Sequence, residues 1–261
     1  ETWREEYWRH HADLHAGFDE FVRSSGAPPL PERQFIWESP YLNLYLYPEE
    51  LDYPRSRPLA PTWHRIDSSV RDTEPPFELP EQLRGEGKLV YVSLGSLGSA
   101  EPELMNRLVR LFAATPHRVI ISLGPQKGQI ALPGNVWGDE YLPQPSILPL
   151  VDAVVTHGGN NTTTECMHFG KPMIVLPLFW DQHDNAQRVQ ERDFGYRLDS
   201  YGFSDEEFYR ALDDLLANEE RRERLRRASA RIQSVDGRRR AADLIERLAR
   251  EKRPLARSTA G

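Results

Sequence analysis

The segment 156-THGGNNTTTE-165 indicates the fold class of this chain, because it marks a point where a strand gives way to a helix. A buried apolar run, residues 152–156, leads into it, and Gly158 and Gly159 allow the tight turn that follows. Small hydroxyl and amide residues then open a helix, which we predict over residues 162–169. The first N–H groups of a helix have no partners inside it and carry partial positive charge. The segment therefore predicts an anion site at the end of a strand.

Strands alternate with helices on both sides of this segment. Apolar runs predict strands at residues 88–94, 118–123 and 173–176, and amphipathic or charged stretches predict helices at residues 102–112, 185–193 and through most of 205–250. Parallel strands need crossover connections, and helices supply them. The sequence therefore predicts an α/β domain with a parallel sheet and helices on both faces.

The first 80 residues do not show this alternation of strands and helices. Residues 2–23 have apolar positions at helical spacing, residues 42–47 alternate as a strand does, and residues 48–80 are rich in proline with no sustained period. We interpret residues 48–80 as a linker and place a domain boundary at residue 80, so that residues 81–261 form the second domain.

Composition excludes several classes of function. The 261 residues carry a formal net charge of −7, which disfavours binding to nucleic acid or to anionic lipid, and no apolar run approaches the ~18 residues of a membrane helix. A single cysteine, Cys166, cannot form an internal disulfide and is expected to be a small core residue, so a cytoplasmic location is the default. The basic clusters 221–227 and 238–240 are expected to lie on solvated helix faces.

The polar residues around the glycine turn suit a nucleoside diphosphate. His157 can donate a hydrogen bond, and Asn161 and Thr162 add donors at the start of the helix, so a diphosphate could be held without a metal. Glu165 lies one turn further on, where its carboxylate could accept from two ribose hydroxyls. Asp181 and Gln182 follow the next strand and could fix sugar hydroxyls. The aromatic Trp180 before them is either core packing or a wall of the sugar site.

These motifs resemble the donor signature of the inverting UDP-glycosyltransferase family, which includes plant secondary-metabolite enzymes, animal glucuronosyltransferases and bacterial macrolide glycosyltransferases. The resemblance is carried by 141-YLPQ-144, 147-ILP-149, 156-THGGNNTTTE-165, 170-GKP-172 and 179-FWDQ-182, and it extends to 90-VYVSLGS-96. It implies the GT-B type of fold, with two facing Rossmann-like domains. Residues 1–80 would then be an incomplete remnant of the N-terminal acceptor domain with the linker, and residues 81–261 would be the donor-binding domain.

The resemblance also implies roles for single residues. Tyr141 stacks on uracil, Leu142 and Gln144 contact the base or ribose, and Ser96 approaches the phosphates. The full set of donor-binding residues that we expect is Ser96, Tyr141, Leu142, Gln144, His157, Gly159, Asn161, Thr162, Glu165, Trp180, Asp181 and Gln182. Asn160 stands where relatives have tryptophan or alanine, so the resemblance gives it no role. The family uses a histidine general base near its N-terminus; no residue here matches it, so we name no catalytic residue.

The expected function is metal-independent transfer of a hexose from a UDP-sugar to a small-molecule acceptor, with inversion and with no cofactor beyond the co-substrate. The carboxylate of Glu165 favours UDP over dTDP, whose deoxyribose has one hydroxyl fewer. The partners are a UDP-sugar, an acceptor, and a missing acceptor domain or partner chain. Two alternatives stay open: a donor-binding subunit of a split glycosyltransferase, inactive alone, and a nucleotide-sugar epimerase or cell-wall sugar transferase of the same fold. A dinucleotide-binding loop at 95-GSLG-98 has little support, because its glycine spacing departs from the usual pattern.

Overall fold

The computed structural model describes residues 2–99 and 101–257, which divide into two compact units. The larger unit comprises Leu44–Pro58 and Arg65–Glu246, and the smaller one comprises the described parts of Glu1–Asn43, Leu59–His64 and Arg247–Gly261. Residues 65–80 thus belong with the sheet, whereas the composition of the chain predicts a domain boundary at residue 80. It stays a prediction that the acceptor and the donor bind to different domains.

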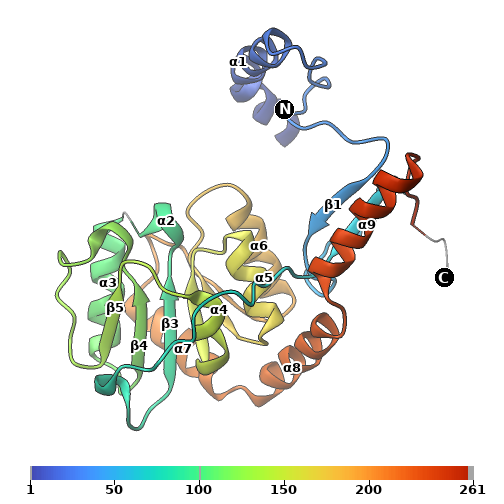
Figure 1. Cartoon of the computed structure of the whole chain (residues 1–261). Helices are drawn as coiled ribbons and strands as arrows, with labels where there is room; N and C mark the ends of the chain where they lie inside the picture. The colour runs from blue at the N-terminus through green and yellow to red at the C-terminus, as the bar shows by residue number, and fades with distance from the viewer. Residues whose placement is uncertain (1, 100, 258–261) are drawn as a thin grey trace. The chain divides into compact units, whose positions relative to one another are not determined.

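The larger unit is built on a six-stranded parallel sheet, which confirms the predicted α/β class (Figure 1). Its strands are β3 (Leu89–Ser93), β4 (Arg118–Ser122), β5 (Val136–Asp139), β6 (Ala153–Thr156), β7 (Met173–Val175) and β8 (Gly195–Arg197), and their order is β5-β4-β3-β6-β7-β8. The first strand of the sheet along the chain, β3, lies in the middle, and β4 and β5 extend the sheet to one edge. The chain then returns to the other side of β3, where β6, β7 and β8 extend the sheet to the opposite edge. The strand order reverses between β3 and β6, which is where ligands bind in open α/β sheets.

Three strands were not predicted from the sequence. The edge strands β5 and β8 have only one buried residue each, Val136 and Gly195, so they contain no apolar run. The third, β2 (Trp63–Ile66), lies in the proline-rich stretch and pairs with β1 (Asn43–Leu46) in a separate two-stranded sheet. The central strands were predicted because they are buried on both faces.

Two hydrophobic cores cover the two faces of the sheet, as the alternation of side chains along a strand requires. On β3, Val90 and Val92 belong to the first core and Tyr91 to the second. Helices α3 (Pro102–Ala113) and α7 (Asp205–Ala217) contribute to the first core. The second core takes side chains from α5 (Asn160–His168), α6 (Asp181–Glu191) and α8 (Glu219–Gln233) and includes the buried thiol of Cys166, as predicted.

Two helices start earlier than the sequence predicts. Helix α5 begins at Asn160 rather than Thr162, and α6 begins at Asp181 rather than Asn185. The polar residues that precede each predicted helix start, 160–161 in α5 and 181–184 in α6, belong to the first turn of the helix. Asp181 and Gln182 are therefore helical residues.

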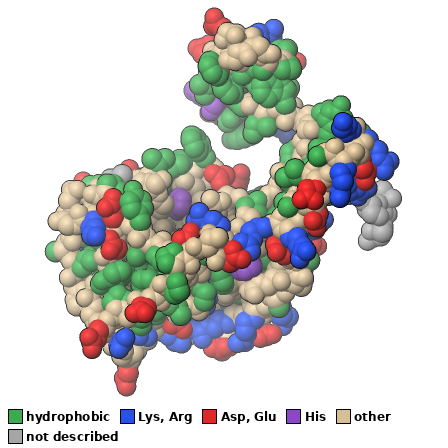
Figure 2. All heavy atoms as spheres, viewed as in Figure 1, with side chains coloured by type: hydrophobic (Ala, Val, Ile, Leu, Met, Phe, Trp, Pro, Cys, Tyr) green, Lys and Arg blue, Asp and Glu red, His purple; other side chains and the backbone are tan. Residues whose placement is uncertain are grey.

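The basic stretch on α8 is only partly a solvated face. Arg226 forms an exposed ion pair with Glu223, whereas Arg222 and Arg224 are partly buried; Arg222 pairs with Glu219, and Arg224 pairs with Glu220 and Asp193. Figure 2 shows mixed charges of this kind on the surface. Arg221 is different, because its side chain is 4% exposed and pairs with Asp193 at 2.7 Å and Asp214 at 2.6 Å. The expectation of a wholly solvated face is thus wrong at Arg221, which ties α8 to α7 and to the turn before β8.

The smaller unit has little core of its own. Helix α1 (Trp3–Ser24) is confirmed and starts with a capping box between Thr2 and Glu5. Among the described residues of the smaller unit, the buried apolar side chains are Val22, Leu30 and Leu255, whereas large apolar side chains of α1 such as Trp3 and Phe21 are exposed. Among the helices formed by the described residues, none combines the length and apolar character needed to cross a bilayer.

The capping box of α7 offers a test of how local sequence stabilises the larger unit. Ser204 accepts a hydrogen bond from the Glu207 backbone, and the Glu207 side chain accepts from the Ser204 backbone. Ser204→Ala is expected to lower the free energy of unfolding by about 1 kcal/mol, because it leaves a helix N–H unpaired. Urea denaturation measures the effect. Glu207→Gln keeps an acceptor and should change stability by less than about 0.5 kcal/mol; equal losses in both variants would contradict this account.

Candidate functional site

The loop after β3 and the glycine turn after β6 meet where the strand order reverses. Ser93 and Thr156 are paired in the register of β3 and β6, so the residues that follow them leave the sheet side by side. Gly95 begins the short helix α2 (Gly95–Gly98) with φ +71°, and a Cβ atom there would lie 2.7 Å from Nε2 of His157. Ser96, expected near the phosphates, is exposed on this helix.

His157 is held between two glycines. A Cβ atom at Gly159 would lie 2.5 Å from its Nε2, closer still than the one at Gly95. Burial lowers the pKa of His157 below its usual value, while the backbone of Ser93 and the charge of Asp181 oppose the shift. Burial therefore favours the neutral imidazole, which carries a single ring N–H on the nitrogen that its tautomer selects.

The N-terminus of α5 follows directly. Gly159 is its N-cap, and the first helical hydrogen bond runs from the Thr163 N–H to the Gly159 carbonyl at 3.0 Å. Asn161 is exposed and Thr162 is buried. Asn160, to which the resemblance assigns no role, donates from Nδ2 to the Leu46 carbonyl at 3.2 Å, which fastens the end of β1 to this helix.

Glu165 lies one turn further along α5, beside two other expected nucleotide contacts. Nε2 of Gln144, in the short helix α4 (Gln144–Ile147), donates to Oε2 of Glu165 at 2.5 Å and to Oγ1 of Thr162 at 3.3 Å. Burial raises the pKa of Glu165, while the Gln144 hydrogen bond and the charge of Arg71 lower it. The structure thus brings together Gln144, Thr162 and Glu165, which come from two segments and were all predicted to contact the nucleotide.

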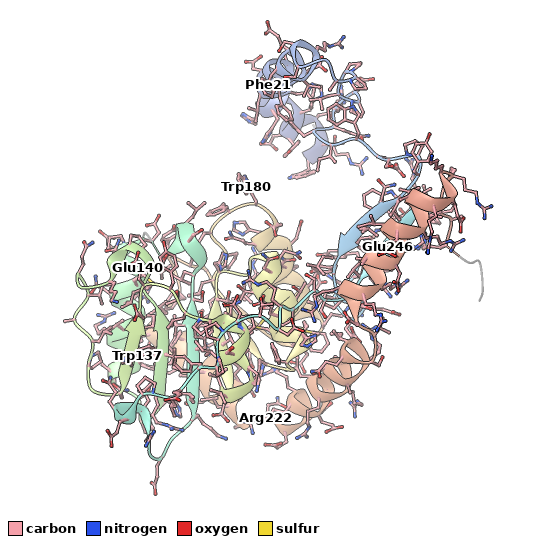
Figure 3. The ribbon with its side chains drawn as sticks, viewed as in Figure 1. Phe21, Trp137, Glu140, Trp180, Arg222 and Glu246 are labelled. Atoms are coloured by element: carbon pink, nitrogen blue, oxygen red, sulfur yellow. The ribbon has the colours of Figure 1, made fainter. Side chains whose placement is uncertain are left out.

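The two aromatic residues of the set stand in solvent. Tyr141 is 80% exposed just before α4, which leaves its ring faces open to a base. Trp180 is 83% exposed, so it is not core packing, and Figure 3 shows it projecting from the loop before α6. Its backbone has φ 53° and ψ −132°, a conformation rare for a residue with a Cβ. Leu142 is partly buried and packs against the second core.

Asp181 and Gln182 occupy the first turn of α6 but face different surroundings. Asp181 is exposed, whereas Gln182 is 3% exposed and its Oε1 accepts from the backbone N–H groups of Leu178 and Phe179 at 2.9 and 3.1 Å. Gln182 therefore shapes the loop that carries Trp180. Its role as a sugar contact stays a prediction.

Sequence reasoning missed Asn185. This residue is 4% exposed, and its Nδ2 donates to the Gly158 carbonyl at 2.8 Å and to Oδ2 of Asp181 at 3.2 Å. One amide thus joins the glycine turn to the first turn of α6. An amide four residues after an aspartate on a helix was the available signal. Within residues 2–99 and 101–257, no three His, Cys, Asp or Glu side chains gather in a group that could hold a metal ion.

Comparisons with known proteins identify the family and the fold of this chain. Residues 44–250 match the family model described as "UDP-glucoronosyl and UDP-glucosyl transferase". An uncharacterized UDP-glucosyltransferase, YdhE of Bacillus subtilis (strain 168), is 31% identical over 143 residues, which are 54% of this chain and 36% of that protein. The chain thus spans about a third of the length of this curated relative.

Solved structures share the fold. The glycosyltransferase of kitacinnamycin superposes with a TM-score of 0.75 at 26% identity, over 94% of this chain and 64% of that one. The glycosyltransferase VinC, solved in complex with dTDP, superposes with a TM-score of 0.63 at 22% identity, over 80% of this chain and 52% of that one.

Proposed function

The chain belongs to the UDP-glucuronosyl and UDP-glucosyl transferase family, and on that premise we propose that its larger unit binds a UDP-sugar. The observation that carries the proposal is the joined arrangement of His157, the N-terminus of α5 and the Gln144–Glu165 pair at the reversal of strand order. The helix terminus and the imidazole suit a diphosphate, and the carboxylate suits a ribose. Tyr141 offers a stacking surface for uracil, and Asp181 offers a carboxylate for sugar hydroxyls.

The whole protein would then transfer a hexose to a small-molecule acceptor with inversion. An acceptor oxygen attacks the anomeric carbon, the bond to the diphosphate oxygen breaks, and a general base outside the residues assigned here takes the acceptor proton. In this chain, the N–H groups at the start of α5 and the ring N–H of His157 would stabilise the charge that develops on the departing diphosphate. No metal is needed for that role.

A donor-binding subunit that works with a separate acceptor-binding chain is the second candidate. Copurification of a second chain from the native source distinguishes the two candidates.

Nucleotide preference tests the assigned ribose contact. We expect UDP to bind about tenfold more tightly than dTDP, because one hydrogen bond from a ribose hydroxyl to a charged acceptor is lost with deoxyribose. Calorimetry with UDP, dTDP and GDP, with magnesium and with EDTA, measures this, and we expect no effect of magnesium. The solved structure of VinC contains dTDP, so dTDP is the relevant competitor of UDP. Equal affinities of this chain for UDP and dTDP would remove the ribose argument. Glu165→Gln should reduce the difference between UDP and dTDP.

A further inference from the structure

The segment that precedes the sheet in the chain covers one side of the predicted ribose site. Residues 65–80 belong to the larger unit, and part of this segment lines a cavity of about 190 Å³ against α5. The cavity is lined by Leu46, by Ser69, Val70 and Arg71 of the segment, and by Asn161, Thr164 and Glu165 of α5. Arg71 and Glu74 also line a second cavity, of about 440 Å³, beside the C-terminal end of α5. Arg71 therefore shares a cavity with the carboxylate assigned to ribose.

Hydrogen bonds on both sides of Arg71 fix this segment to the larger unit. Ser68 Oγ lies 2.9 Å from Nδ1 of His168, at the C-terminal end of α5. The hydroxyl of Ser146, in α4, donates to the Pro75 carbonyl at 2.8 Å. Arg238 donates to both carboxylate oxygens of Asp72, at 2.7 and 2.9 Å. The backbone around Arg71 is thus held against the elements that carry Glu165 and Gln144.

Three charged side chains interact around Arg71, which lines both cavities. Burial raises the pKa of Glu165, Arg71 lowers it, and Glu74 raises it again. Arg71 is itself bound by Glu74, with Nη2 2.8 Å from Oε1. Among the described residues, Tyr91 and Cys166 also interact electrostatically with Glu165, and burial raises the pKa of both, so they stay neutral. Arg71 is the cation of this set, and two carboxylates compete for it.

We propose that Arg71 and Glu74 set the charge of the ribose-binding carboxylate: Arg71 keeps Glu165 ionised, and Glu74 competes for Arg71 and limits that effect. The inference rests on the proposed function, because it gives the segment a role in nucleotide binding. An ionised carboxylate accepts hydrogen bonds from two ribose hydroxyls at once, whereas a protonated one has lost part of that capacity. Arg71 and Glu74 are positioning residues that act through Glu165.

Two variants should move the pH dependence of UDP binding in opposite directions. In Arg71→Ala the carboxyl group of Glu165 loses its cation, so it protonates at a higher pH. UDP affinity should then be about threefold weaker than wild type at pH 5 and unchanged at pH 8. In Glu74→Gln, Arg71 is released to Glu165, so affinity at pH 5 should equal or exceed that of wild type. Calorimetry on the full chain measures both, and protonation of His157 affects all variants alike.

Three controls distinguish this effect from a structural one. Arg71→Lys keeps the charge and should restore most of the wild-type pH profile. Arg227→Ala removes an arginine of equal exposure, 66%, from an ion pair on α8 and should leave the profile unchanged. Uridine should respond to Arg71→Ala as UDP does, because the effect passes through ribose. A larger loss for UDP than for uridine at pH 8 would instead mean that Arg71 binds the diphosphate, and it would overturn the proposal.

A second measurement tests the coupling without any ligand. The Glu165 carboxyl carbon can be titrated by NMR in glutamate-labelled chain and assigned with Glu165→Gln. Its pKa should rise in Arg71→Ala and fall in Glu74→Gln. Shifts in the same direction, or no shift in either variant, would overturn the inference. If the two variants show these shifts but the wild-type chain fails to bind UDP, the coupling stands and the proposed function is removed instead.

Discussion

Glu165→Ala is expected to weaken UDP binding by about 10- to 100-fold. The carboxylate is the acceptor for two ribose hydroxyls in the proposed complex, and hydrogen bonds to a charged group contribute about 1.5–3 kcal/mol. The variant also deprives Gln144, whose Nε2 donates to Glu165, of its acceptor. Both changes act on the ribose, so uridine should lose affinity by a similar factor.

The matched control is Glu140→Ala, which removes an exposed carboxylate just after β5 (Figure 3). It should leave UDP affinity unchanged within about twofold. Glu165→Gln keeps one acceptor and the packing of α5, so its loss should be smaller than that of the alanine variant. Binding of UDP to Glu165→Ala at nearly wild-type affinity would remove this residue from the nucleotide site.

Gly159→Ala is expected to weaken UDP binding to the level of His157→Ala, about 10- to 100-fold, with little loss of stability. The added Cβ would lie 2.5 Å from Nε2 and 2.9 Å from Cε1 of His157, so the ring has to move. The backbone of Gly159, with φ −59° and ψ 145°, suits alanine, and therefore the cost falls on the imidazole and not on the turn. Calorimetry with UDP and urea denaturation separate the two effects.

A double-mutant cycle makes this prediction specific. In the His157→Ala background there is no ring to displace, so Gly159→Ala should cost little further affinity. Gly134→Ala, where an added Cβ meets nothing within 4 Å, is the steric control and should bind UDP as wild type does. Additive losses in the double variant would show that Gly159 acts on the ligand directly.

Much of this architecture could be predicted from the sequence because it depends on local patterns. The strands β3, β4, β6 and β7 lie in the middle of the sheet, where burial on both faces leaves continuous apolar runs. The edge strand β8 has a single buried residue, so no pattern marks it. The comparisons confirm the family and the GT-B type of fold that the motifs suggested.

The site was predictable only where its residues follow one another in the chain. One continuous segment contains the glycine turn, the start of α5 and Glu165. The order of these residues along the chain is enough to predict a site for a nucleoside diphosphate. The packing of Gly95 against His157 and the approach of Arg71 to Glu165 join segments far apart in the chain. Such contacts depend on tertiary structure, and composition or spacing does not encode them. The hydrogen bond from the Leu178 N–H to the side chain of Gln182 also depends on tertiary structure. Spacing in the sequence does not show that Gln182 is buried.

The most direct test of this account is a crystal structure of the chain with UDP. We predict a diphosphate within hydrogen-bond distance of the ring of His157 and of the backbone N–H groups at the start of α5. The ribose hydroxyls should lie on Glu165 and the uracil against Tyr141. UDP bound elsewhere on the chain, or a pocket that stays closed by its own side chains at saturating UDP, would contradict the account.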